Sequence, residues 1–278
     1  MAEIREGRIR TGQADTFFLE AGRGEPVILI HGSGPGVSAR ANWRFALPAL
    51  ADSGRILAPE LLGFGSTTTT EPVACDVWLW VDQIARFVEG LGIARCSVVG
   101  NSLGGAIALG LAVRHPALVE RIVTMGTVGV PFPITSGLDQ VWGYTPGLAQ
   151  MRHLVGLFTW DTRYATDEEL VRLRHEASSG DPAARYSALF PAPRQRWVDA
   201  LAIADVDLAT IRVPVLLIHG RDDRIIPWDA TSLRMLDLLP DARLLLLPRC
   251  GHWVQIERRD EFHAAVRDFL SPARRSGA

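Results

Sequence analysis

Several features that would identify a protein class at once are scarce or missing in this chain. Cysteine occurs three times in 278 residues, at Cys75, Cys96 and Cys250, which is an odd number and too sparse for a disulfide framework. No apolar run approaches the ~20 residues that span a bilayer, and no charged-then-apolar leader begins the sequence. We therefore expect a cytoplasmic protein in a reducing compartment, without a membrane partner.

A strong excess of charge is also missing. The formal net charge is -2 and the sequence pI is about 6.4, which argues against a surface for nucleic acid or anionic membranes. Cys250 lies close to His252, but no second cysteine or histidine follows at metal-ligand spacing, so we interpret Cys250 as a packed thiol. The sequence predicts a small-molecule partner, no metal and no cofactor.

The chain does contain a serine flanked by glycines. Gly100 and Gly104 bracket Ser102 in a G-x-S-x-G segment that follows an apolar run and precedes a helix-compatible stretch. Glycine at both positions lets a strand and a helix approach each other around a strained serine. Ser102 is therefore the candidate nucleophile, although the pattern alone also matches ordinary turns.

Partners for this serine follow in the order acid, then histidine. Asp222 and Asp223 come just after the apolar strand 215–218, and His252 follows the apolar run 244–247. The carboxyl ends of parallel strands meet at one sheet edge, where ligand sites assemble. A serine needs an imidazole to take its proton, and the imidazole needs a carboxylate to orient it. Each residue alone fits a helix cap, a turn former or a packed histidine; together they predict a catalytic triad, with either aspartate as its acid.

A glycine-rich loop near the amino terminus supplies a further component. The apolar strand 26–30 runs into His31-Gly-Ser-Gly-Pro-Gly, which exposes backbone N–H groups. Acyl transfer needs two such donors aimed at the developing oxyanion, and the candidates are the amides of Ser33 and Leu103. The alternative, a phosphate cradle, lacks the lysine of G-x-x-x-x-G-K-[ST] and the spacing of G-x-G-x-x-G.

Short apolar strands alternate with helix-length segments along most of the chain. This alternation predicts an α/β fold with a mostly parallel central sheet flanked by helices. Between Met125 and Val213 the pattern changes to helical, with Thr166 or Asp167 as a helix N-cap. We therefore expect a helical cap over 130–205, inserted into a core formed by 1–129 and 206–278. The expected strands are 17–20, 27–31, 55–58, 96–100, 122–125, 215–219 and 244–247.

With these elements in place, the whole chain resembles the α/β-hydrolase superfamily. More narrowly, it resembles the meta-cleavage-product hydrolases, which split a carbon–carbon bond in ring-fission products of aromatic degradation. The cap segments are most similar to members that act on monocyclic products, from phenol, toluene and alkylbenzenes. The resemblance is carried in the core by 31–36 with Asn42 and Trp43, by 100–105, 220–224 and 250–257, and in the cap by 137–146, 169–178 and 193–197.

The resemblance implies a reaction. The substrate would be a 2-hydroxy-6-oxo-hexa-2,4-dienoate, which water cleaves at the C6 ketone into 2-hydroxypenta-2,4-dienoate and a carboxylic acid. Asp223 is favoured over Asp222 because related acids lie four residues before the proline of this loop, here Pro227. An acyl-enzyme on Ser102 and a gem-diol route both stay open, as does the C6 substituent.

The resemblance also implies substrate-binding residues. The planar guanidinium of Arg174 is expected to hold the C1 carboxylate, with Arg172 as the less favoured alternative. The remaining residues similar to family binding residues are Gly34, Asn42, Asn101 and Trp253 at the dienoate and Val128 and Trp142 at the C6 group.

One departure from the family and two rival functions complete the expectations. Glu60 stands where many relatives carry aspartate in a structural turn, so we expect a reshaped turn with little effect on catalysis. Family members are commonly dimers or larger, which implies a homo-oligomer. The rivals are a carboxylesterase or other acyl hydrolase with the same triad, and a non-catalytic ligand receptor on a hydrolase scaffold. Haloalkane dehalogenases and epoxide hydrolases are excluded because they need an aspartate at position 102.

Overall fold

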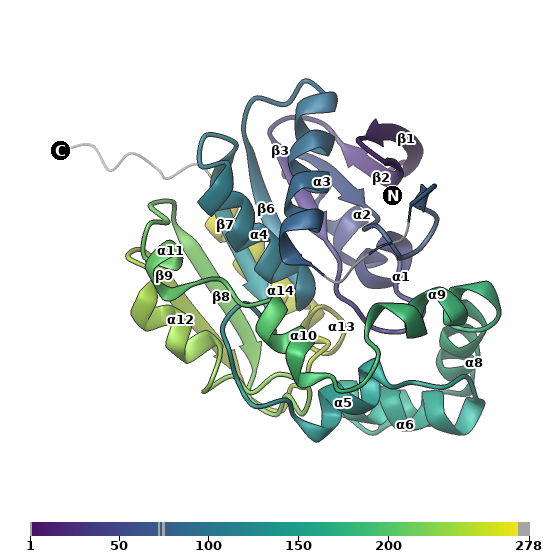
Figure 1. Ribbon diagram of the computed structural model, residues 1–278. Helices are drawn as coiled ribbons and strands as arrows, with labels where there is room; N and C mark the ends of the chain where they lie inside the picture. Colours follow the sequence, from purple (N-terminus) through teal and green to yellow (C-terminus); the bar gives the residue numbers. More distant parts are fainter. Residues whose placement is uncertain (1, 72, 74–75, 272–278) are drawn as a thin grey trace.

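A single mixed sheet runs through the computed structural model, which describes residues 2–71, 73 and 76–271, so Cys75 lies outside the described residues. The strand order is β1-β2-β4-β3-β6-β7-β8-β9, with β5 paired to β2 (Figure 1). Pairs involving β2 are antiparallel, and every pair from β4 to β9 is parallel, which confirms the predicted mostly parallel sheet. The strands are β1 (Arg5–Thr11), β2 (Ala14–Gly22), β3 (Pro26–Ile30), β4 (Arg55–Pro59), β5 (Thr68–Thr69), β6 (Cys96–Asn101), β7 (Val119–Met125), β8 (Val215–Gly220) and β9 (Ala242–Leu247).

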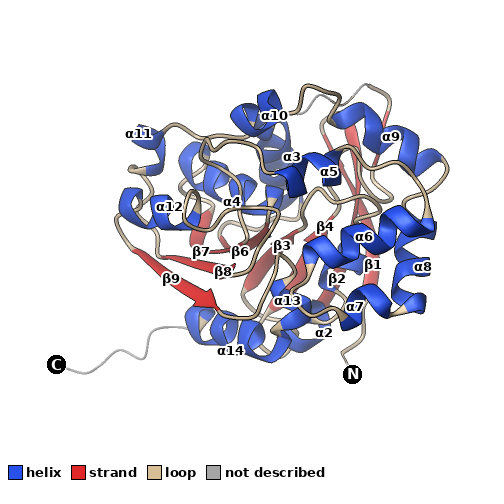
Figure 2. Ribbon diagram, turned by 90° about the horizontal axis from the view of Figure 1, so that it is seen from below, coloured by secondary structure: helices blue, strands red, loops and turns tan. Residues whose placement is uncertain are grey.

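Helices cover both faces of the sheet, as Figure 2 shows. Side chains alternate along a strand, so Ile28 and Ile30 of β3 join one apolar cluster while Val27 and Leu29 join the other. The first cluster includes α3 (Val77–Gly90), α4 (Leu103–Arg114) and α12 (Ser232–Leu238). The second includes α1 (Ala39–Trp43), α2 (Ala46–Leu50), α13 (Val254–Glu257) and α14 (Arg259–Leu270).

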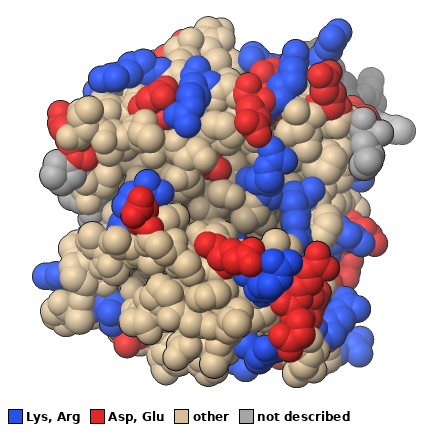
Figure 3. Space-filling view, turned by 90° about the vertical axis from the view of Figure 1, so that its right-hand side faces the viewer, with Lys and Arg blue, Asp and Glu red and all other residues tan. Residues whose placement is uncertain are grey.

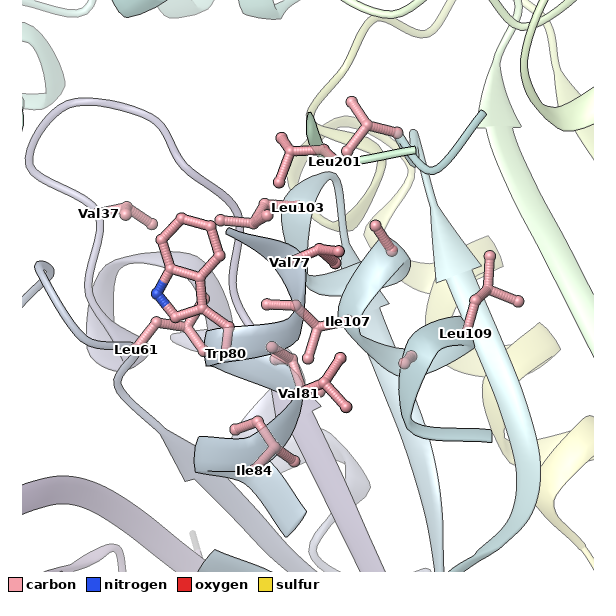
Figure 4. Packing of buried hydrophobic residues seen from close by; sticks show 14 of the residues in the cluster. Val37, Leu61, Val77, Trp80, Val81, Ile84, Leu103, Ile107, Leu109 and Leu201 are labelled. Carbon is pink, nitrogen blue, oxygen red and sulfur yellow. The ribbon is translucent and has the colours of Figure 1, made fainter. Parts of the chain in front are cut away.

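The first cluster is centred on the contact between α3 and α4 (Figure 4). Trp80 is fully buried there, and its Nε1–H donates to the Leu62 carbonyl at 3.0 Å, so the indole has no unpaired donor. Ile107 of α4 packs within the same group of side chains. This packing fixes α4, whose first turn begins at the candidate nucleophile.

A helical insertion lies between β7 and β8 and forms the lower part of the molecule in Figure 1. The first apolar cluster continues into it through Phe158 and Leu170, so insertion and core share buried side chains. Of the two N-cap candidates, Asp167 caps α8, and its Oδ1 accepts from the Leu170 amide at 3.0 Å. The limits 130–205 stay a prediction. The inserted helices are α5 (Ser136–Trp142), α6 (Leu148–Phe158), α7 (Arg163–Thr166), α8 (Glu168–Ala177), α9 (Asp181–Leu189) and α10 (Gln195–Ala200), followed by α11 (Asp205–Leu208).

Two strands were not predicted. β1 is an edge strand in which exposed and half-buried residues alternate, and it carries Arg5, Arg8 and Arg10, so it has no apolar run. β5 has two residues and exists only through its pairing with β2. Among the described residues, none of the helices combines the length and apolar character that crossing a bilayer requires.

Candidate active site

Ser102 lies at the sharp turn between β6 and α4. Its backbone has φ 54° and ψ −114°, a left-handed conformation that is strained for a residue with a side chain. A Cβ on Gly100 would stand 2.2 Å from the Gly104 carbonyl oxygen, and one on Gly104 would stand 2.1 Å from the Ile30 oxygen, so both glycines are needed. Ser102 occupies the N-cap position of α4, but its side chain makes no capping hydrogen bond. The helix-cap explanation therefore fails.

Asp223 and His252 form a buried pair. His252 Nδ1–H donates to Asp223 Oδ2 at 2.7 Å. The other oxygen, Oδ1, accepts from the amides of Ile225 at 2.8 Å and Ile226 at 3.0 Å. Burial by itself would raise the pKa of Asp223, but the charge of His252 and the hydrogen bonds of two histidines outweigh it and hold that pKa well below its usual range. The carboxylate is thus ionised and orients the imidazole.

The alternative acid, Asp222, does not contact His252. Its Oδ2 accepts from the Cys250 amide at 3.4 Å, and its own amide donates to the Cys250 carbonyl at 2.9 Å. Cys250 is buried, and burial raises the pKa of its thiol, as expected for a packed cysteine. Among the described residues, no group of three histidine, cysteine or acidic side chains is placed to hold a metal ion.

Ser102 and His252 line the same cavity, which has a volume of about 310 Å³. Within the described chain, no hydrogen bond joins their side chains, and such catalytic bonds often tighten only when substrate binds. Gly126 lies against the imidazole of His252, and a Cβ at this position would be 3.0 Å from His252 Nδ1. The backbone φ of Gly126 is 53°, which also favours glycine. Phe158 of α6 also stacks on the imidazole, with ring centroids 5.9 Å apart. The imidazole is thus held between the core and the insertion.

The glycine-rich loop after β3 is oriented by a buried histidine. Burial lowers the pKa of His31 to about 4, so its ring is neutral. Nε2 accepts from the Leu61 amide at 3.0 Å, which places the proton on Nδ1, and Nδ1–H donates to the Gly32 carbonyl at 2.7 Å. The C=O and N–H of a trans peptide point in opposite directions, so the Ser33 N–H points away from this ring. Leu103 opens α4, and its amide has no carbonyl one turn earlier in the helix.

Three residues that line the cavity carry buried polar atoms without partners. Within the described part of the chain, Nε of Arg174, Nδ2 of Asn42 and Oε1 of Gln255 make no hydrogen bond, and all three residues line the cavity. Burying an unpaired polar atom costs free energy, and at a cavity wall a ligand can supply the missing partner. The described lining therefore offers two donors and one acceptor to a ligand.

Arg174 is held by the glycine-rich loop. Its Nη2 donates to the Pro35 carbonyl at 2.8 Å and its Nη1 to the Gly36 carbonyl at 3.4 Å, and the guanidinium lies 5.4 Å from the centre of the Trp253 ring. Burial, and then the charge of Arg44, lower the pKa of Arg174 to about 10, so it remains a cation at neutral pH. Arg172 instead is exposed and pairs with Glu176 at 2.8 Å, outside the cavity lining.

The cavity lining combines basic and apolar side chains. Its described lining includes Arg40, Arg44 and Arg174 but no aspartate or glutamate. Figure 3 shows a hollow on this side of the molecule, with both basic and acidic side chains along its edge. The apolar part of the lining includes Leu138, Val141, Phe158 and Ile225.

The structure places most, but not all, of the predicted site residues in the cavity. Val128 and Trp142 do not line it, contrary to prediction. Trp142 is buried, stacks on Phe190 with centroids 4.5 Å apart, and donates its Nε1–H to Ser33 Oγ at 3.1 Å, so it supports the glycine-rich loop from behind. Asp223 and Leu103 lie outside the lining. The predicted residues that line the cavity are Ser33, Gly34, Asn42, Asn101, Ser102, Arg174, His252 and Trp253.

Sequence reasoning missed several residues of the site, and three of them contact or extend its reactive groups. Phe158 stacks on Trp253 with centroids 4.7 Å apart, and Gln255 brings an unpaired acceptor to the cavity lining. His219, at the end of β8, lies 3.1 Å from Asp223 Oδ2 through its Nε2. Only His219 had a usable signal, because it ends a strand at the same sheet edge as the other candidates.

Glu60 departs from the expected aspartate and organises a turn behind the glycine-rich loop. Its carboxylate accepts from the amides of Ala39, at 2.9 Å, and Ser66. A Cβ on Gly65 would lie 2.1 Å from Glu60 Oε2, so the turn is shaped around the longer acid. Burial raises the pKa of Glu60 although these hydrogen bonds oppose the shift.

Comparison with known proteins places this geometry in context. Residues 25–259 match the family model described as alpha/beta hydrolase fold. A 2-hydroxy-6-oxo-2,4-heptadienoate hydrolase from Pseudomonas putida is 46% identical over 95% of both chains. A 2-hydroxymuconate semialdehyde hydrolase from a Pseudomonas species is 46% identical over 98% of this chain and 94% of its own. A solved meta-cleavage product hydrolase from Pseudomonas fluorescens, a mutant complexed with acetates, is 44% identical, covers 95% of this chain and 97% of its own, and has a TM-score of 0.92.

Proposed function

We propose how the cavity performs catalysis on the premise that this chain belongs to the alpha/beta hydrolase fold family and, within it, to the meta-cleavage product hydrolases. The chain is a serine-type hydrolase that cleaves a carbon–carbon bond in 2-hydroxy-6-oxo-hexa-2,4-dienoates. Water adds at the C6 ketone, the bond between C5 and C6 breaks, and 2-hydroxypenta-2,4-dienoate leaves with a carboxylic acid. The observation that supports this substrate class is a cavity lined by Ser102 and His252 of the triad and by residues with unpaired buried donors.

The reacting groups are Ser102, His252 and Asp223. Because His252 Nδ1–H is bonded to the ionised Asp223, the other ring nitrogen carries a lone pair that accepts a proton. His252 takes protons during ketonisation of the dienol and during hydrolysis, and Ser102 acts at the C6 carbonyl. The amides of Ser33 and Leu103 stabilise the oxygen that becomes negative there.

The dienoate part of the substrate binds beside the unpaired polar atoms of the cavity lining. Arg174 meets the C1 carboxylate, and its unpaired Nε–H supports this role because a carboxylate supplies the missing acceptor. Asn42 Nδ2 donates to a second substrate oxygen in the same way. Asn101 and Gly34 line the same cavity, and the Trp253 ring forms the wall on which the diene stacks.

The C6 substituent lies among apolar side chains of the lining, such as Leu138, Val141 and Ile225. The relatives at 42–46% identity carry names of heptadienoate and muconate semialdehyde hydrolases, which supports a small substituent from a monocyclic aromatic compound. A panel of ring-fission products that differ only at C6 tests this. The highest kcat/KM is expected for hydrogen or methyl at C6, and a preference for an aryl group would contradict the assignment.

The cellular compartment and the oligomeric state of the enzyme are also proposals. Cys96 and Cys250 are both free and buried, which supports work in a reducing, cytoplasmic compartment. A homo-oligomer, dimer or larger, rests on the family resemblance, and analytical ultracentrifugation measures it directly. No cofactor is needed for the reaction as written.

The triad is tested by the Ser102→Ala variant. The decay of the yellow dienolate is followed in parent and variant, and hydrolysis is expected to fall by at least about a thousandfold because no hydroxyl acts at the carbonyl. Full retention of hydrolysis would remove Ser102 from the mechanism. Circular dichroism checks that the variant folds.

Assays of the parent protein on two substrates distinguish the proposed function from its rivals. A p-nitrophenyl ester is assayed beside the ring-fission product, and a carboxylesterase would turn over the ester faster. Tight binding of the ring-fission product without turnover by the parent protein would indicate a ligand receptor. The Nε of Arg174, which has no partner among the described residues, favours a carboxylate-bearing substrate over a neutral ester.

A further inference from the structure

A second buried histidine contacts the carboxylate of the catalytic pair. His219 is fully buried near the end of β8, and its Nε2 lies 3.1 Å from Asp223 Oδ2 and 3.1 Å from the Ile226 carbonyl oxygen. Oδ2 is also the oxygen that His252 Nδ1 contacts at 2.7 Å. One carboxylate oxygen therefore accepts from two imidazoles.

The surroundings of His219 fix its tautomer. Both atoms facing Nε2 are acceptors, so Nε2 carries the proton. The other nitrogen, Nδ1, lies 2.7 Å from the hydroxyl of Ser232, a buried residue at the start of α12. That hydroxyl donates to Nδ1 and completes a chain of hydrogen bonds from Ser232 through His219 to Asp223.

We propose that His219 is a positioning residue that holds the catalytic carboxylate and limits how strongly it attracts the protonated form of His252. The proposal rests on the triad assigned above. Donation by His219 draws negative charge from the same oxygen that pairs with His252. Without this donation, Asp223 stabilises the imidazolium more strongly, and the histidine is less able to release its proton or to act as a free base near neutral pH.

The other charged groups near this pair are engaged elsewhere. Arg224, in the loop after β8, donates to backbone carbonyls of the insertion at the end of α6. Glu257 of α13 accepts from three backbone amides, and the buried Cys250 thiol has a raised pKa and is uncharged at neutral pH. Within the described residues, the titratable groups that hydrogen-bond to the carboxylate are the imidazoles of His219 and His252.

Two amide substitutions of His219 distinguish the role of its Nε2, which donates to Asp223, from that of its Nδ1, which accepts from Ser232. The His219→Gln side chain reaches the place of Nε2 and keeps a donor for Asp223. The His219→Asn side chain reaches only the place of Nδ1, keeps a partner for Ser232 and loses that donor. The pH dependence of kcat/KM on the ring-fission product is measured for both. In His219→Asn the acid limb is expected to move to higher pH by about half to one unit, and in His219→Gln it stays near the parent's.

The Ser232→Ala variant is the second measurement, and it decides the matter if His219→Asn does not fold. It weakens the donor strength of His219 without removing it, so a smaller shift in the same direction is expected. If the acid limb of the pH profile coincides with the parent's in both His219→Asn and Ser232→Ala, the proposal is overturned, even if kcat falls. A merely structural role would lower the rate without moving the acid limb. A fully active Ser102→Ala variant, by contrast, contradicts the triad itself, whatever the His219 variants do.

Discussion

Replacing Arg174 by methionine should separate substrate binding from stability. The guanidinium donates hydrogen bonds to the Pro35 and Gly36 carbonyls, while its buried Nε has no partner among the described residues. Burial and the nearby Arg44 lower its pKa from 12.5 to about 10, which corresponds to about 3 kcal/mol for keeping the cation there. A bound carboxylate offsets this cost, and the methionine variant never incurs it.

The expected result is a large kinetic effect with little loss of stability. Losing a charged hydrogen-bond donor to the substrate carboxylate costs about 2–3 kcal/mol, which lowers kcat/KM by roughly 30- to 150-fold, and most of the change falls on KM because the C1 carboxylate keeps its charge throughout the reaction. The Tm of the ligand-free protein should stay level or rise, because an incompletely paired buried charge is removed. Dienolate decay gives the kinetics, and scanning calorimetry gives the Tm.

Arg172→Met on the same helix is the matched control. Arg172 is exposed and pairs with Glu176, one turn away, a contact worth about 0.3–0.5 kcal/mol. Its loss should leave kcat/KM unchanged and lower the Tm by no more than about 2 °C. If Arg174→Met loses several degrees of Tm and keeps its KM, the assignment of Arg174 to the substrate carboxylate is wrong.

Two further substitutions test the supports of the site. Gly126→Ala puts a Cβ 3.0 Å from His252 Nδ1 at a backbone φ of 53°, so kcat should fall at least about tenfold at an unchanged circular dichroism spectrum, and parental kcat would contradict the contact. Glu60→Gln turns an amide N–H toward one of two backbone donors and should cost about 1–3 kcal/mol of stability. Burial raises the pKa of Glu60, so this residue contributes to the free energy of unfolding at low pH, and the contribution is lost as pH rises. The difference in Tm between the parent and Glu60→Gln should therefore be larger at pH 4 than at pH 8. A difference that grows as pH rises would refute this.

The sequence by itself determined the elements and the order of the reactive residues. Apolar runs mark buried parallel strands because both faces of those strands must be covered. Gly100 and Gly104 mark the turn at Ser102, because β6 and α4 approach so closely there that a Cβ on either glycine would clash with the backbone. The strand ends then bring Ser102, Asp223 and His252 to one edge. β1 escaped prediction because an exposed edge strand needs no apolar run.

Only the tertiary structure decided which side chains meet. It brings Asp223 rather than Asp222 to His252, adds His219 to the same carboxylate oxygen, and turns Trp142 behind the glycine-rich loop instead of into the cavity. Adjacent residues in a loop differ in direction by the path of the backbone, and a tryptophan on an inserted helix faces whatever that helix packs against. Periodicity fixes which side of an element is buried, but the partner across the contact depends on packing between segments far apart in the chain.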